Sequence, residues 1–196
     1  SKLRIIPNGI SNEFTYQAPE KNKRNSRNLL QIGTGPNKNL ERIIAALNGL
    51  QCHLTIIGNP SESQIQLLHL HHVQYTIKSG LDRNQIVDEY RACDALLFLS
   101  TYEGFGLPIL EANAVGRAVI TSNIEPMLEV AGPSGFFIDP NDIEQIRAAI
   151  ARVLNDTAFR QELVVSGLKN ASKYHIRNVG LAHEAIYREL ALVKPR

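Results

Sequence analysis

The chain is poor in several residue types that mark particular protein classes. Its 196 residues include no tryptophan and one methionine, and only 6% are aromatic. A composition that is ordinary in apolar residues but poor in aromatics is typical of a Val/Ile/Leu-rich α/β protein and excludes a disordered or fibrous one. The formal net charge is only +2. This does not predict the basic patch of a nucleic-acid-binding protein, so we expect no nucleic-acid partner.

Cysteines and long apolar segments are also scarce. Cys52 and Cys93 lie far apart and outside any CxxC pair. We therefore favour two buried thiols in a reducing compartment over a disulfide or a metal site. The longest near-apolar segment, residues 95–99, is too short to cross a membrane, and no signal peptide is visible.

Short apolar segments predict strands that alternate with helices. We expect strands at residues 3–6, 29–32, 54–57, 73–77, 95–99, 118–121 and 135–138. Most are continuously apolar rather than alternating, which is typical of strands buried on both faces of a parallel sheet. The first is stopped by Pro7-Asn8-Gly9. Because a chain rarely opens inside a strand, we expect the natural protein to extend further upstream.

Helices are predicted from apolar spacing and from capping residues. Leu40, Ile43, Ile44 and Leu47 lie on one helical face that ends before Gly49. Ser61 with Gln64 and Asp82 with Gln85 predict capping boxes. Asn141 with Glu144 predicts a helix start, with Ile143, Ile146, Ile150 and Val153 on its apolar face. Two further helices are expected at residues 159–172 and 179–193, the second with a stripe of Val179, Ala182, Ile186 and Leu190.

This alternation predicts a Rossmann-like, doubly wound parallel sheet with a C-terminal helical tail. We divide the chain into residues 1–176, which form the sheet domain, and residues 177–196, which form the last helix. In such folds ligands bind beyond the carboxyl ends of the strands.

The segment Glu103-Gly-Phe-Gly-Leu-Pro-Ile-Leu-Glu111 follows a predicted strand and opens a helix. Gly104 and Gly106 permit a tight turn and a close approach of ligand to backbone, and Pro108 suits a first helical turn. The free N–H groups of such a helix start can bind an anion such as a diphosphate.

Glu111 lies one turn further, about 6 Å along the helix axis, where a carboxylate could accept hydrogen bonds from both hydroxyls of a ribose. Glu103 lies in the turn, beside a sugar attached to that diphosphate. The alternative is a plain strand–turn–helix junction, in which Glu103 complements the helix dipole and Glu111 lies on a solvated face.

The same segment resembles the E-x7-E signature of the retaining glycosyltransferases with the GT-B fold. Other segments resemble that family in the same order: Pro7-Asn8-Gly9, residues 33–39 with Lys38, residues 90–100, 114–122, 129–132 and 135–140. The resemblance implies that the chain is the donor-binding, C-terminal half of such an enzyme.

The resemblance also implies a role for each matching residue. Glu111 would bind the donor ribose, and Glu103 would contact the transferred sugar. Lys38 would neutralise the leaving diphosphate, which the N–H groups of Gly104, Phe105, Gly106 and Leu107 would hold. The helix dipole disfavours a cation at a helix start, so Lys38 is explained if an anion binds there; a solvated surface lysine is the alternative. Gly33 and Thr34 complete the phosphate loop, and Ile77 and Lys78 lie near the expected base pocket.

Some positions depart from the family's pattern. Thr34 replaces the arginine that usually accompanies the lysine, which removes one positive charge from the leaving-group site. Losing such an electrostatic stabiliser commonly costs ~10²–10³ in rate. Ser11 replaces an aspartate, residues 123–128 replace a glycine-rich stretch, and Tyr174-His175-Ile176 replaces a Phe-Ser-Trp.

From the resemblance we expect transfer of a sugar from a nucleoside-diphosphate sugar to a glycan or lipid acceptor, with retention and without cofactor or metal. The acceptor site would lie in an N-terminal domain toward which the last helix packs, so this chain alone would transfer little. We expect a cytoplasmic protein, with peripheral association at the inner face of a membrane in its full-length form. Two alternatives stay open: a degenerate, non-catalytic nucleotide-sensing or interaction module, and an epimerase or glycan phosphorylase of the same fold.

Two other groups of residues receive ordinary interpretations. His69, His71 and His72 do not have the spacing of a zinc site and are interpreted as the polar end of a helix. The basic segment 21–27 is interpreted as a solvated loop, with contact to anionic lipid as the alternative.

Overall fold

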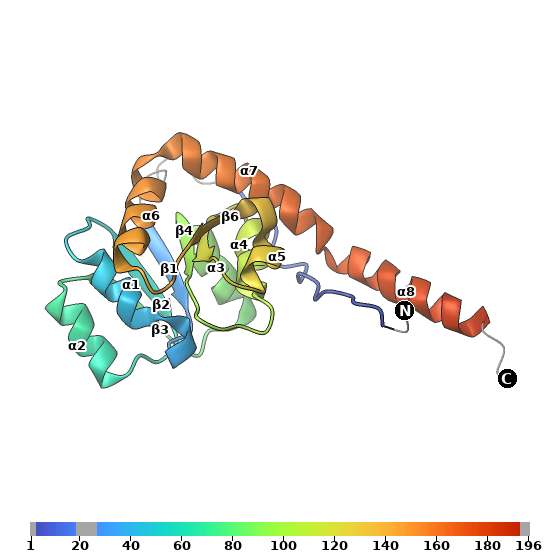
Figure 1. Cartoon of the computed structure of the whole chain (residues 1–196), viewed down its shortest axis with the longest axis horizontal. Coiled ribbons are helices and arrows are strands. Elements are labelled where there is room, and N and C mark those ends of the chain that lie inside the picture. The colour runs from blue at the N-terminus through green and yellow to red at the C-terminus, as the bar shows by residue number, and fades with distance from the viewer. Residues whose placement is uncertain (1–2, 19–26, 193–196) are drawn as a thin grey trace.

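The protein forms a six-stranded parallel sheet between two layers of helices (Figure 1). The computed structural model describes residues 3–18 and 27–192. The strands are β1 (Asn28–Ile32), β2 (His53–Ile57), β3 (Gln74–Lys78), β4 (Ala95–Phe98), β5 (Ala118–Ser122) and β6 (Gly135–Ile138). Their order is β3-β2-β1-β4-β5-β6, that of a Rossmann-like sheet, which confirms the predicted fold class.

Helices cover both faces of the sheet. They are α1 (Leu40–Leu47), α2 (Glu62–Leu70), α3 (Arg83–Ala92), α4 (Leu107–Ala114), α5 (Met127–Ala131), α6 (Ile143–Asn155), α7 (Thr157–Lys173) and α8 (Ile176–Leu192), with short 3-10 helices η2 (Pro36–Lys38) and η3 (Gly132–Ser134). One apolar core joins the sheet to α1, α2 and α6, and the other joins it to α3, α4 and α5. Leu29 and Leu30, adjacent in β1, are both fully buried in opposite cores, which explains why the strands are continuously apolar.

Both predicted capping boxes are confirmed, whereas the last two helices begin at Thr157 and Ile176, two and three residues before their predicted starts. Ser61 and Asp82 each form the complete capping box with a glutamine three residues later. The start at Asn141 is wrong by one residue, because Asp142 is the cap and its carboxylate accepts from the N–H groups of Glu144 and Gln145. Ile143 was expected on the apolar face, but it is 38% exposed because it lies in the first turn, at the edge of the core.

The N-terminal segment does not form the strand predicted at residues 3–6. Among the residues that the structure describes, no strand pairs with it there, and Ile5 is 85% exposed. The segment instead runs beside the last helix, since Arg4 pairs with Glu189 at 3.2 Å and Ile10 forms a parallel bridge with His175.

Helix α8 projects away from the sheet domain beyond α7 (Figure 1). Its predicted stripe is buried only at Val179, while Leu190 is 62% exposed. Leu181 and Tyr187 are exposed as well. The helix therefore presents apolar surface that the described part of the chain does not cover.

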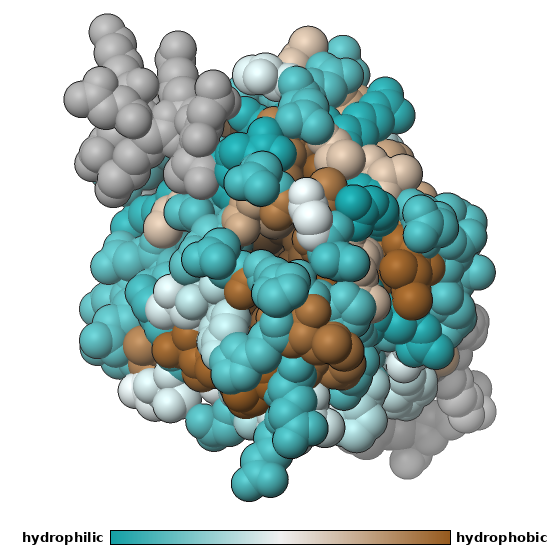
Figure 2. Space-filling model, turned by 90° about the vertical axis from the view of Figure 1, so that its left-hand side faces the viewer, coloured by the Kyte–Doolittle hydropathy of each residue, from teal (hydrophilic) through white to brown (hydrophobic). Residues whose placement is uncertain are grey.

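The cysteines and the surface have simple descriptions. Both cysteines are free; Cys93 is buried, but Cys52 is only half-buried. Burial raises the pKa of the Cys93 thiol to about 12, so it is unreactive at neutral pH. Figure 2 shows hydrophobic side chains reaching the surface in several places among hydrophilic ones on the α2 side of the molecule. Within residues 3–18 and 27–192, no helix is long and apolar enough to cross a bilayer.

Candidate functional site

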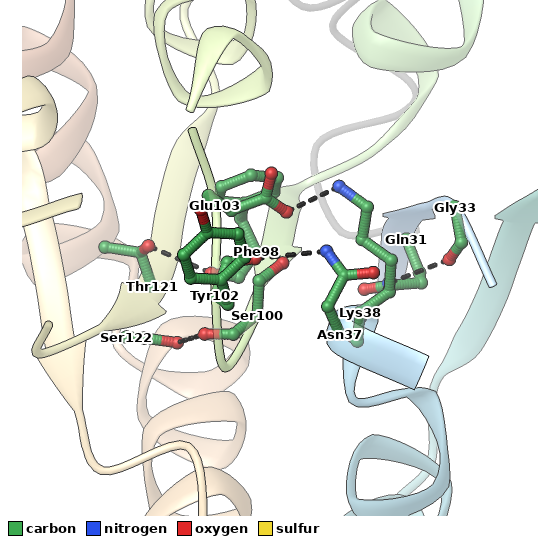
Figure 3. Close-up of polar contacts among 10 residues, drawn as sticks. All are labelled: Gln31, Gly33, Asn37, Lys38, Phe98, Ser100, Tyr102, Glu103, Thr121 and Ser122. Atoms are coloured by element: carbon green, nitrogen blue, oxygen red, sulfur yellow. Dashed lines mark hydrogen bonds and ion pairs between the residues drawn. The ribbon is translucent and has the colours of Figure 1, made fainter. Parts of the chain in front are cut away.

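The sheet places two loops at the point where its strand order reverses. The chain leaves β1 toward α1 and leaves the neighbouring β4 toward α4, so the connections that follow these strands border the same gap. Lys38 comes from the first connection and Glu103 from the second. Their side chains meet with Lys38 Nζ 2.5 Å from Glu103 Oε1, and 22% and 15% of their surfaces stay exposed (Figure 3). Two residues predicted as catalytic are therefore in direct contact.

The two loops are tied together by backbone and amide hydrogen bonds. Asn37 Nδ2 donates to the Tyr102 carbonyl at 3.0 Å, and the Thr101 N–H donates to the Asn37 carbonyl at 2.9 Å. Figure 3 shows Asn37 and Lys38 side by side, facing the Tyr102–Glu103 turn. These contacts fix the separation of the loops and hence the position of the ion pair.

Buried polar side chains also support each loop from the sheet. On β1, Gln31 Nε2 donates to the carbonyls of Gly33 and Lys38 at 3.1 and 3.3 Å. On β5, Thr121 and Ser122 donate to the carbonyls of Phe98 and Ser100 at 2.9 and 2.7 Å. The loops thus leave the strands in a fixed direction.

Gly33 and Thr34 lie where the phosphate loop was predicted. Gly33 has φ +86°, and a Cβ there would lie 2.9 Å from Lys38 Cε, so a larger residue would displace the lysine. Thr34 Oγ1 donates to the Asn59 carbonyl at 2.9 Å. This hydroxyl is therefore engaged, and the position contributes no positive charge.

The start of α4 offers a row of unpaired backbone donors. Gly106, at φ +105°, turns the chain into the helix, and Leu107 and Pro108 form its first turn. In the described ranges, no group accepts a hydrogen bond from the N–H groups of residues 104–107. A Cβ on Gly104 would find nothing within 4 Å, so a ligand can approach the backbone there. The Phe105 ring instead packs edge-on against Tyr174.

Glu111 lies further along α4 and is not the solvated residue of the alternative interpretation. Its Oε2 accepts a hydrogen bond from the Tyr90 hydroxyl at 2.7 Å. Burial raises the pKa of Glu111, while the Tyr90 hydrogen bond and the charge of Arg83 act in the opposite direction. Glu111 is therefore a partly buried carboxylate that is held by one protein donor and can accept further hydrogen bonds, not a solvated surface charge.

Ile77 and Lys78 are not brought together with Lys38 and Glu103. They lie at the carboxyl end of β3, the outermost strand on that side of the sheet. Because β2 lies between β3 and β1, they are roughly 10 Å from the carboxyl end of β1. Lys78 pairs with Glu89 at 2.5 Å. The chain then enters α3 at Arg83, whose charge acts on Glu111, so the connection from β3 ends near α4.

Sequence reasoning missed the residues that hold the site. Tyr90 lies 21 positions from Glu111, and no local pattern marks the pair. Gln31 was hidden inside an apolar strand, although a buried polar residue near a strand end is itself a signal. Asn37 lies next to Lys38 and could have been found by its position. The Tyr102 side chain, next to Glu103 in the turn, is 74% exposed.

Features elsewhere do not suggest a metal site or a competing centre. Across the described residues, no three His, Cys, Asp or Glu side chains are grouped so as to hold a metal. His69 bonds to the Tyr75 hydroxyl at 3.0 Å. Residues 21–26 of the basic segment lie outside the described residues, as does residue 193 of the last predicted helix.

Two hollows open along the N-terminal segment rather than at the sheet edge. One, of about 210 Å³, is lined by Gly9, Ser11, Asn12, Glu13, Arg83 and Ile176. The other, of about 230 Å³, lies between residues 10–16 and helices α4 and α7. Neither includes Lys38, Glu103 or Glu111. We place the candidate site at the ion pair, because paired charge and free backbone donors coincide there.

Known proteins resemble this chain in sequence and in fold. A family model described as "Glycosyl transferases group 1" matches residues 14–170. An O-antigen chain mannosyltransferase of Escherichia coli is 40% identical over 89 residues, which are 45% of this chain and 23% of that protein. A serotype-specific mannosyltransferase of the same species is 33% identical over 168 residues, 77% of this chain and 20% of that protein.

The fold likeness extends over nearly the whole chain. A glycosyltransferase structure from Rickettsia africae matches with a TM-score of 0.86 at 18% identity and covers 98% of this chain and 58% of that one. The chain spans only about a fifth of the length of the two curated relatives.

Proposed function

The chain belongs to the group 1 glycosyl transferases, and we propose that it binds a nucleoside-diphosphate sugar and, within a longer protein, transfers the sugar with retention of configuration. The observation that carries this proposal is the Lys38–Glu103 ion pair beside the free N–H groups of α4. One cation, one carboxylate and a helix start together match a ligand with a diphosphate and a polar sugar.

The diphosphate would lie against the start of α4. The N–H groups of Gly104, Phe105, Gly106 and Leu107 would donate to its oxygens, helped by the positive end of the helix dipole. Lys38 would turn from Glu103 to the diphosphate. As the bond between the anomeric carbon and the phosphate oxygen breaks, negative charge grows on that oxygen, and these donors stabilise it.

Glu103 would hold the transferred sugar near its reacting carbon. Freed from Lys38 by the diphosphate, its carboxylate can accept hydrogen bonds from sugar hydroxyls and stabilise the positive charge that develops on the ring. We assign it positioning and charge stabilisation rather than nucleophilic attack, in keeping with transfer on one face of the sugar.

The nucleoside would lie toward α3 and β3. Glu111 would accept from the ribose hydroxyls, and the backbone of Ile77 and Lys78 would contact the base. Arg83, at the start of α3, lies close enough to Glu111 for its charge to lower the pKa of that carboxyl group. The connection from β3 to α3 therefore ends near α4, which supports this arrangement.

The transferred sugar is proposed from the relatives. Both curated relatives are named as mannosyltransferases, and one acts on an O-antigen chain. We propose a mannosyl donor and a polysaccharide or lipid-linked acceptor, at the cytoplasmic face of a membrane. An N-terminal domain, packed against the exposed side of α8, would bind that acceptor, so this chain alone would transfer little. The reaction would need no metal, because Lys38 and α4 supply the positive charge.

A second candidate is a module that binds nucleotide without transfer. Thr34 favours it, because its hydroxyl is engaged by Asn59 and the site holds one cation fewer than its family pattern. A longer protein that binds donor but transfers no sugar would support this candidate.

The proposal is tested by calorimetric titration of the chain with UDP, GDP and ADP. We expect one nucleotide to bind, and Glu111→Ala to bind it much more weakly but still measurably. Glu144→Ala, at an exposed glutamate in the first turn of α6, is the matched control and should bind normally. If no nucleotide binds the folded chain at millimolar concentration, the donor-binding role of this chain is wrong.

A further inference from the structure

Tyr90 is a fully buried residue whose hydroxyl has one partner. It lies on α3 with 0% exposure and donates to Glu111 Oε2 at 2.7 Å. The ring of Phe14, from the N-terminal segment, packs edge-on against the Tyr90 ring with centroids 5.7 Å apart. A ring held on that side inside a core cannot swing, so the direction of the hydroxyl is set by the fold.

Because of this contact, one carboxylate oxygen of Glu111 is bound to the protein and the other is open to a ligand. Oε2 is committed to Tyr90, whereas no described residue donates to Oε1. Fixing one oxygen also fixes the plane of the carboxylate, and a group that is already ordered loses less entropy when a ligand binds. The free oxygen is therefore presented in one orientation.

The contact also bears on the charge of Glu111. An ionised carboxylate accepts hydrogen bonds, but burial disfavours that form and raises the pKa of Glu111. The groups that oppose this effect are the Tyr90 hydroxyl and the guanidinium of Arg83, both on α3. Cys93, on the same side, stays a neutral thiol because burial raises its pKa to about 12.

We propose that Tyr90 is a positioning residue that orients Glu111, so that Glu111 Oε1 accepts from the ribose hydroxyls. This inference rests on the proposed donor-binding function and adds a residue that touches no ligand. Tyr90 acts only through Glu111.

The first test compares nucleoside-diphosphate affinity in the wild type and Tyr90→Phe by calorimetry across acidic to neutral pH, with the best-bound of UDP, GDP and ADP. Losing a hydrogen bond to a charged group predicts about tenfold weaker binding at neutral pH. The pH at which binding is lost on acidification should also move upward. Tyr75→Phe removes a hydroxyl that is hydrogen-bonded to His69 rather than to Glu111, and it should change neither quantity.

A coupling test separates positioning from general damage. In a Glu111→Ala background no carboxylate is left to orient, so adding Tyr90→Phe should produce no further loss of affinity. If the two losses add, or if Tyr90→Phe alone binds like the wild type at every pH, the inference is overturned.

A readout without nucleotide keeps the inference distinct from the proposed function. The ¹³C shift of the Glu111 carboxyl carbon reports its titration directly, and Tyr90→Phe should raise its midpoint. If wild-type chain binds no nucleotide, the proposed function fails, yet this titration still decides the role of Tyr90. An unchanged midpoint overturns it.

Discussion

The substitution Lys38→Met keeps most of the aliphatic side chain and removes its charge. In the empty protein this leaves Glu103 without the cation that lies 2.5 Å away. The pair is neither exposed nor fully buried, at 22% and 15% exposure. Exposed pairs contribute ~0–1 kcal/mol, whereas loss of one partner of a buried pair costs ~3–5 kcal/mol, so we expect a loss of about 2 kcal/mol in unfolding free energy. The midpoint temperature of thermal unfolding should then be about 6 °C lower.

The effect on ligand binding should be larger and selective. A charge-assisted hydrogen bond to phosphate contributes ~1.5–3 kcal/mol, which corresponds to roughly 10–100-fold in affinity for a nucleoside diphosphate. The unpaired Glu103 carboxylate would add repulsion of the anion. The nucleoside without phosphates makes no contact with Lys38, so its affinity should stay unchanged.

Calorimetry with a nucleoside diphosphate and the matching nucleoside measures both effects. Arg188→Met is the control, because it removes the same net charge from an exposed pair with Glu184 on α8. It should bind both ligands like the wild type. The reasoning is refuted if Lys38→Met binds the diphosphate normally, or loses affinity for nucleoside and diphosphate alike.

Three further predictions concern α4 and its surroundings. Glu111→Gln should raise the melting temperature of the ligand-free chain at neutral pH by a few degrees, because burial raises the pKa of Glu111. The wild type loses stability as the pH rises from the ordinary pKa of a glutamate through the raised pKa of Glu111, and melting measured against pH should show no such loss in the variant. Arg117 is 5% exposed and donates to backbone carbonyls at the ends of α3 and α4. Arg117→Met should therefore lower the free energy of unfolding, measured by chemical denaturation, by about 3 kcal/mol, and a loss below about 1 kcal/mol would contradict this. Gly104→Ala should melt normally but bind nucleoside diphosphate weakly, since its Cβ meets only open space, whereas Gly106→Ala, at φ +105°, should also destabilise the fold.

The sequence predicts the sheet well because each strand is identified locally. Runs such as residues 95–99 are continuously apolar, which is typical of strands in a parallel sheet covered on both faces. Residues 3–6 have the same appearance but lack a partner strand, and pairing is a property of the whole fold. The cap moved from Asn141 to Asp142 because both side chains can accept from a helix start, and neighbouring backbone geometry decides between them.

The sequence predicts the residues of the motif before and within α4, but not the side chains that contact them. The motif identified Glu103, Glu111 and the turn between them, since these lie within one strand–turn–helix unit. The contact of Glu103 with Lys38 depends on the neighbouring positions of β1 and β4, which alternation of strands and helices does not specify. Tyr90 and Glu111 meet because α3 and α4 cover the same face of the sheet and share one apolar core, again a fact of tertiary structure.

The most direct test of the central claim is to locate the bound nucleotide by amide chemical shifts of ¹⁵N-labelled chain during titration with a nucleoside diphosphate. The account predicts that the largest shifts fall on Gly33, Thr34 and residues 104–107, with smaller shifts along α4 to Glu111. Shifts confined to the hollow lined by Gly9, Ser11, Asn12, Glu13, Arg83 and Ile176 would contradict it.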